Sequence, residues 1–123
     1  MESLSPNIYV NDLPATIRFY QNLGFSNIAS VPDDGTEPIW TMMQHGNVTM
    51  MFEAFKSIEG RLPDVRRENG GSLMLYFKVP DVEAFYEQIK DQVTVLHGLE
   101  KTFYGATEFT IKDCNDYVLT FAS

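Results

Sequence analysis

The sequence predicts an α+β fold built from two similar βαβββ modules, and three observations lead to this prediction. Short β-rich runs alternate with only two segments that have helical apolar spacing. A constant shift of 69 positions brings the elements of the first half onto those of the second. The chain has 123 residues, of which 44% are hydrophobic, so it holds enough apolar side chains for one buried core and too few for two large domains. We therefore predict one domain over 1–123, with module 1 at about 1–55, a linker at 56–71 and module 2 at about 72–123.

The first module begins with a short strand and a helix. Asp12 is a typical helix-capping residue, Pro14 fits the first turn, and Gly24 is expected to end the helix. The sequence His45-Gly46-Asn47 has the composition of a hairpin turn. The predicted strands of this module are Ile8–Val10, Phe25–Val31, Ile39–Gln44 and Val48–Ala54.

The second module repeats this order after a charged linker that contains Pro63 and has room for one helical turn. Asp81 is expected to cap a helix that runs to about Gln92. The predicted strands are Ser72–Val79, Val93–Leu96, Glu108–Lys112 and Tyr117–Ala122. The shift of 69 pairs identical residues: Val10 with Val79, Asp12 with Asp81, Ala15 with Ala84, Thr41 with Thr110, and Phe52 with Phe121.

Several short motifs in this order resemble a known family. They are Val10-Asn11-Asp12-Leu13, Phe19-Tyr20, Leu23-Gly24-Phe25, Tyr104-Gly105, Glu108-Phe109, and Asp113-Cys114-Asn115-Asp116-Tyr117 with Leu119 and Phe121. The chain resembles the glyoxalase, bleomycin-resistance and dioxygenase superfamily, also called vicinal oxygen chelate proteins. The resemblance covers nearly the whole chain and implies that the two modules form a curved mixed sheet around a cleft. It does not imply one activity, because the same scaffold hosts metal lyases, dioxygenases and metal-free drug binders.

In that fold each helix covers one face of its sheet and the other face lines the cleft, so strand alternation predicts which side chains are available to a ligand. The alternation of side chains along the strands places Trp40, Phe109 and Ile111 in the core. It places Thr41, Glu108 and Thr110 on the cleft face. The candidate ligand-binding residues are Asn7, Tyr9, Met51, Glu53, Met74, Tyr76, Lys78, Glu108 and Thr120.

Metal-dependent members of this superfamily use His, Glu or Gln from the first and last strands of the two modules as ligands. The resemblance places those four positions on Ser5, Met51, Met74 and Thr120, and none of these residues carries an imidazole or a carboxylate. His45 and His97 are both expected in loops, away from the cleft. We therefore expect no metal and no other cofactor.

Net charge and cysteine content limit the classes of binding partner and the cellular location that we expect. Nine basic against 17 acidic residues give a net charge of −8, which disfavours binding to nucleic acid or to an anionic membrane surface. The single cysteine, Cys114, cannot form an internal disulfide, and no signal peptide or membrane span is apparent, so we expect a cytoplasmic protein. Related proteins commonly pair, and the resemblance implies a homodimer.

Three functions are open at this point. The first is a metal-free binding protein, similar to bleomycin-resistance proteins, that sequesters a cationic or aromatic compound by contact with tyrosine, methionine and carboxylate side chains. The second is a lyase or isomerase that uses an unorthodox metal, or Glu53 or Glu108 as a general base. The third is an interaction module with no small ligand. Metal analysis and a thermal-shift screen distinguish these functions.

Overall fold

The computed structural model describes residues 1–66 and 68–123 and divides into two compact units, Met1–Asn69 and Gly70–Ser123. The division falls inside the charged segment 56–71. Each unit contains one helix of eight or more residues and one four-stranded mixed sheet. The predicted α+β fold with two similar βαβββ modules is therefore confirmed.

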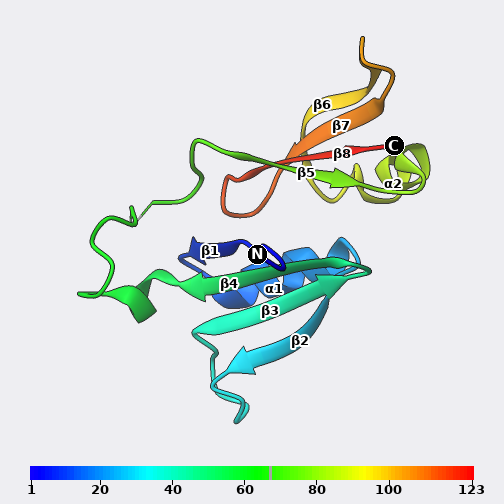
Figure 1. The fold of residues 1–123 in the computed structure, drawn as a ribbon. Coiled ribbons are helices and arrows are strands. Elements are labelled where there is room, and N and C mark those ends of the chain that lie inside the picture. Colours follow the sequence, from blue (N-terminus) through cyan, green and yellow to red (C-terminus); the bar gives the residue numbers. More distant parts are fainter. Residues whose placement is uncertain (67) are drawn as a thin grey trace. The chain divides into compact units, whose positions relative to one another are not determined.

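Unit 1 (Met1–Asn69) has the strand order β1-β4-β3-β2, in which β1 runs parallel to β4 and the other neighbours are antiparallel (Figure 1). A 3-10 helix, η1, follows the last strand. The bounds are β1 Asn7–Val10, α1 Leu13–Asn22, β2 Ser26–Val31, β3 Trp40–His45, β4 Val48–Ala54 and η1 Phe55–Ile58.

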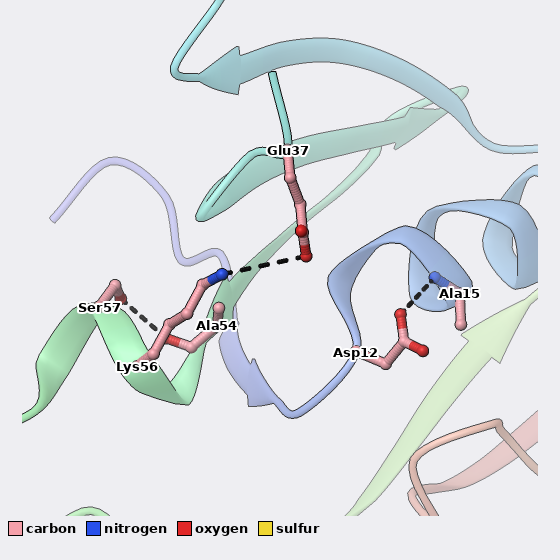
Figure 2. Close-up of polar contacts among 6 residues, drawn as sticks. All are labelled: Asp12, Ala15, Glu37, Ala54, Lys56 and Ser57. Atoms are coloured by element: carbon pink, nitrogen blue, oxygen red, sulfur yellow. Dashed lines mark hydrogen bonds and ion pairs between the residues drawn. The ribbon is translucent and has the colours of Figure 1, made fainter. Parts of the chain in front are cut away.

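Helix α1 begins and ends as its sequence predicts. The Asp12 side chain accepts a hydrogen bond from the Ala15 backbone N–H at 2.9 Å, which satisfies one of the free amide groups of the first turn (Figure 2). Gly24 follows the helix with a φ of +102°, a conformation that glycine adopts without steric cost. Leu13 and Tyr20 are buried, and so the helix covers one face of the sheet.

Unit 2 (Gly70–Ser123) has the equivalent strand order β5-β8-β7-β6 (Figure 1). Asp81 caps α2 through the Ala84 N–H at 3.0 Å, as predicted. The bounds are β5 Met74–Lys78, α2 Val82–Ile89, β6 Thr94–Lys101, β7 Thr107–Lys112 and β8 Val118–Ala122. The helix ends three residues before the predicted Gln92, and β6 continues past the predicted end at Leu96.

The core of unit 2 is a cluster of aromatic rings between α2 and the sheet. Phe121 lies at its centre, with ring-centroid distances of 4.9 Å to Phe85, 5.0 Å to Phe77 and 5.3 Å to Phe109. Phe109 and Phe121 are almost completely buried. Removing a buried ring of this kind costs about 3–5 kcal/mol of stability, so this cluster fixes which face of the sheet is covered.

The internal repeat holds for the parallel strand pairs but not for the third strand. Asn7 pairs with Met51, and Met74 pairs with Val118, so the partners lie 44 positions apart in both units. In unit 1, however, Trp40 pairs with Glu53, whereas in unit 2 Glu108 pairs with Ala122. Trp40 therefore corresponds to Glu108, at a shift of 68. The cause is the connection between the third and fourth strands of each sheet, which is one residue shorter in unit 1 than in unit 2.

This one-residue difference corrects two predictions. Trp40 lies on the face opposite the helix rather than in the core, and Thr41, expected on that face, pairs with Phe52 and is fully buried. A slip of one residue moves every side chain of a strand to the other face of its sheet. Phe109 and Ile111 are buried, as predicted.

Candidate binding faces of the two sheets

Each sheet has one face covered by its helix and a second face that we call the open face. In unit 1 the register places six larger side chains on the open face because strand partners point to the same side. These residues are Asn7, Tyr9, Trp40, Met42, Met51 and Glu53.

The carboxylate of Glu53 is held in place by two uncharged donors. Asn7 Nδ2 donates to Glu53 Oε1 at 2.9 Å, and Ser57 Oγ donates to Glu53 Oε2 at 2.5 Å. Asn7 comes from β1 and Ser57 from η1, where its hydroxyl also lies 2.8 Å from the Ala54 carbonyl oxygen (Figure 2). The β1–β4 pairing and the tight turn after β4 thus orient both oxygens of one half-buried carboxylate.

Aromatic and thioether side chains surround this carboxylate. Tyr9 and Trp40 pair with Glu53 from its two neighbouring strands, so both lie directly beside it. Met42 pairs with Met51 in the adjacent row of the same face. The ring of Phe55 stacks near Tyr9 with a centroid distance of 6.3 Å.

This arrangement suits a cation that also has apolar surface. Glu53 has no ion-pair partner among the residues that the structure describes, so its charge is oriented but not neutralised. Tyrosine and tryptophan faces attract cations, and methionine adapts to irregular apolar groups. The charged pair that is present nearby, Lys56 with Glu37 at 3.9 Å, involves a different carboxylate (Figure 2).

Two rows of paired residues cross the open face of unit 2. One runs from Tyr76 through Thr120 and Thr110 to His97, and the second runs from Lys78 through Ala122 and Glu108 to Glu100. Thr120 is buried in the central strand, where its hydroxyl is hydrogen-bonded to that of Thr110 at 2.8 Å.

Glu108 is contacted by two tyrosines. The Tyr104 hydroxyl donates to Glu108 Oε1 at 2.8 Å, and the Tyr76 hydroxyl donates to Oε2 at 3.2 Å. The pKa of Tyr104 is raised mainly by its hydrogen bond to Glu108. The pKa of Tyr76 is raised first by reduced hydration of its hydroxyl and second by its own hydrogen bond to Glu108. Both phenols therefore stay protonated and remain hydrogen-bond donors well above neutral pH.

The predicted candidate residues thus fall into one cluster per unit. Asn7, Tyr9, Met51 and Glu53 are neighbours on the open face of unit 1. In unit 2, Tyr76 contacts Glu108 and pairs with Thr120, while Met74 and Lys78 lie at the two ends of β5. Whether these residues bind a ligand stays a prediction.

Both histidines were predicted in loops, and both lie in strands. His97 does not lie in a connection between elements: it belongs to β6 and pairs with Thr110 on the open face. Residues His97 and Gly98 have loop composition, but the strand continues through them with two shifts in register, which is how a strand accommodates extra residues. His45 ends β3 rather than starting a loop, and its ring lies against Phe25 at a centroid distance of 5.5 Å.

The sequence did not identify four residues that complete these clusters. A constant shift of 69 places Trp40 and Met42 on the helix side of the sheet, so strand alternation does not identify them as open-face residues. The sequence does not identify Ser57, because the alternation of β4 does not predict that the following 3-10 helix brings a side chain back to Glu53. Tyr104, four residues before Glu108, belongs to a motif that resembles the family, but it lies in a loop where strand alternation does not apply.

The metal-ligand positions implied by the family do not fit a metal in this chain. Met51 and Thr120 lie on open faces of their sheets and Met74 begins β5, but neither a thioether nor a hydroxyl replaces imidazole or carboxylate for zinc or iron. In residues 1–66 and 68–123 no three His, Cys, Asp or Glu side chains are grouped so that they could hold a metal ion.

The sequence between residues 4 and 121 matches the family model described as the glyoxalase/bleomycin resistance protein/dioxygenase superfamily. The chain belongs to this superfamily. No curated protein matches the chain significantly. Among the described residues no helix is long and apolar enough to cross a membrane.

Several solved structures share the fold at low sequence identity. A glyoxalase/bleomycin resistance protein/dioxygenase family enzyme from Burkholderia phytofirmans PsJN has a TM-score of 0.77 and 22% identity, with 96% of this chain and 94% of that one covered. The bleomycin resistance determinant encoded on transposon Tn5 has a TM-score of 0.70 and 20% identity, with 100% and 98% covered. A bleomycin-binding protein complexed with bleomycin has a TM-score of 0.68 and 20% identity at the same coverage.

Proposed function

We propose that this member of the glyoxalase superfamily is a metal-free binding protein that sequesters a cationic, partly aromatic small molecule and does not alter it. In this proposal the protein acts in the cytoplasm as a homodimer. Antibiotic resistance by sequestration is the biological role that it suggests.

The observation that carries the proposal is the environment of Glu53. Two neutral donors, Asn7 and Ser57, fix its carboxylate at hydrogen-bond distances of 2.9 and 2.5 Å without cancelling its charge. Tyr9 and Trp40 are its direct strand partners. A cation that contacts this carboxylate would be stabilised by charge pairing and by the two ring faces at the same time.

Two further facts support binding rather than metal chemistry. The residues at the family's ligand positions lack the donors that a catalytic metal needs. Solved structures with the same fold include a bleomycin-binding protein, so the scaffold accommodates a drug-sized ligand in at least that protein. The transfer of this role to the present chain rests on the chemistry of the open faces.

A thermal-shift screen of cationic drugs and metabolites is the first test, because a ligand that binds only the folded state raises the melting temperature. The best compound is then titrated by calorimetry against the wild type, Glu53→Gln and Glu37→Gln. Glu53→Gln removes the negative charge of the side chain and retains one oxygen acceptor. Glu37→Gln is the matched control, since its carboxylate is exposed and pairs only with Lys56 at 3.9 Å among the described residues.

We expect Glu53→Gln to weaken binding by about 1–3 kcal/mol and Glu37→Gln to leave it within about 0.5 kcal/mol of the wild type. Equal affinity of all three proteins for the best compound would show that Glu53 is not part of the binding face. Conversion of the compound to a product during the titration would favour a lyase or isomerase instead.

A further inference from the structure

The second carboxylate, Glu108, has a different environment from Glu53, and the difference bears on the chemistry of the ligand. Each of its two oxygens accepts a hydrogen bond from a tyrosine hydroxyl, at 2.8 Å from Tyr104 and 3.2 Å from Tyr76. The two hydroxyls meet at one carboxylate, so the two rings converge on it from β5 and from the loop before β7.

The aromatic side chains at this carboxylate are open to solvent. The exposed fraction is 46% for Tyr76 and 57% for Tyr104, and Phe103, whose ring lies 5.1 Å from that of Tyr104, is completely exposed. Exposed aromatic rings around a negative charge form the kind of site that holds alkylated ammonium groups, because the ring faces attract the cation and the alkyl groups contact the rings.

The local charge is negative and is not paired. Glu100 is the strand partner of Glu108, so two carboxylates lie directly opposite each other on the open face. Neither forms an ion pair within residues 1–66 and 68–123. Lys78 is in the same row, but Ala122 separates it from Glu108, which places the two strands about 9–10 Å apart.

The hydrogen bonds also indicate which cation fits. A primary ammonium or a guanidinium needs several acceptors for its N–H groups, and phenol hydroxyls already occupy two of the about four acceptor positions of the Glu108 carboxylate. A quaternary ammonium has no N–H group, so it makes no such demand and gains from the negative charge and the rings alone.

We propose that Tyr76, Tyr104 and Glu108 form a subsite in unit 2 that recognises a methylated ammonium group. This inference rests on the proposed binding function and specifies its ligand class. Phe103 extends the apolar surface of the subsite, and Glu100 adds to its negative potential.

The test uses choline as the probe and its neutral carbon analogue, 3,3-dimethylbutan-1-ol, as the matched control for shape. Both are titrated into the isotopically labelled full chain, and amide chemical shifts of residues 104–108 give site and affinity. We expect choline to shift these amides and to bind about tenfold more tightly than the neutral analogue, since a tenfold ratio corresponds to 1.4 kcal/mol, within the range of a cation at aromatic faces.

Four variants identify the contributing groups. Glu108→Gln and Tyr104→Leu are expected to weaken choline binding by about tenfold and about fivefold, respectively. Tyr104→Phe, which keeps the ring and loses the hydroxyl, should weaken it less than Tyr104→Leu does. Glu87→Gln on α2 removes a carboxylate that pairs with Lys90 and should have no effect. Circular dichroism and an unchanged melting temperature establish that each variant is folded.

Two results would overturn the inference and leave the proposed function standing. One is that choline and its neutral analogue bind equally weakly, while a compound from the thermal-shift screen binds and responds to Glu53→Gln. The other is that choline binds but Glu108→Gln and Tyr104→Leu do not change its affinity. If no screened compound and no probe binds the wild type, both the inference and the proposed function are wrong.

Discussion

At the scale of single residues, the open faces combine carboxylates with neutral donors rather than with cations. Glu53 accepts from an amide and a serine hydroxyl, and Glu108 accepts from two phenols. Such partners fix the geometry of a carboxylate and leave its charge available. A salt bridge at the same position would orient the group but would also neutralise it, so the choice of partners favours an external cation.

The contacts of Glu108 predict an unusual tyrosine titration. Both Tyr104 and Tyr76 have a pKa above the ordinary value of 10.0. We expect Glu108→Gln to move part of the tyrosine absorbance change to lower pH, because the variant lacks the charge that opposes phenolate formation. Glu87→Gln is the control, and identical titration curves for all three proteins would contradict the hydrogen bonds from Tyr104 and Tyr76 to Glu108.

The sign of the stability effect follows from the same pKa shifts. The folded chain holds these two phenol protons more tightly than the unfolded chain does. Their contribution to the free energy of unfolding is therefore fully present below pH 10 and is lost as the pH rises through the higher folded-state pKa. The Glu108→Gln variant should lose less stability than the wild type over this alkaline range.

Thr41 tests the corrected orientation of its strand. Its hydroxyl is buried and donates to Asn27 Oδ1 at 2.9 Å, with the Ala29 carbonyl oxygen at 3.0 Å. We expect Thr41→Val to lower the free energy of unfolding by about 0.5–1.5 kcal/mol in urea denaturation, because it removes hydrogen bonds inside the protein. Thr49→Val, on the open face, should change it by less than about 0.5 kcal/mol. The reverse ranking would contradict the register of β3.

At the scale of elements, the register of β3 decides what the open face of unit 1 contains. It places Trp40, the single tryptophan of the chain, beside Glu53. We expect acrylamide to quench its fluorescence readily, and a ligand on this face to change the emission and slow the quenching. A blue-shifted emission that resists acrylamide in the free protein would put Trp40 in the core and contradict the register.

The same strand shows how far the sequence predicts the structure. Element order, both helix caps and the faces of β1, β4, β5 and β7 were predictable, because capping chemistry and apolar alternation are local properties. The orientation of β3 was not, since it depends on the length of one turn relative to its counterpart in the other unit. The continuation of β6 through His97 and Gly98 was not predictable either, because pairing with β7 overrides their loop composition.

The residues of the candidate site also include some that the sequence predicts and some that it does not. Nine candidates were placed on their faces by alternation and by resemblance to the family. The residues that orient the two carboxylates, apart from Asn7 and Tyr76, were missed. Ser57 comes from a short 3-10 helix and Tyr104 from a loop, where side-chain direction follows no period that the sequence displays.

At the scale of the whole molecule, exposed apolar side chains predict self-association. Met74, Leu96 and Val31 have exposed fractions of 50%, 43% and 51%. Large apolar side chains at the surface commonly mark an interface, and symmetric pairs are the most frequent assemblies. We expect a homodimer, for which light scattering would give about twice the 14.0 kDa of one chain. A mass near that of one chain at all micromolar concentrations would contradict it.

The central claim is that the protein binds a cationic small molecule without a metal and without changing it. Equilibrium dialysis of chelator-treated protein against the best compound from the screen, followed by mass spectrometry of the retained compound, tests every part of that claim at once. We predict saturable, stoichiometric retention that chelation does not reduce, and recovery of the compound with its mass unchanged. Loss of retention after chelation, together with one equivalent of transition metal in the untreated protein, or recovery of a converted product, would contradict the claim.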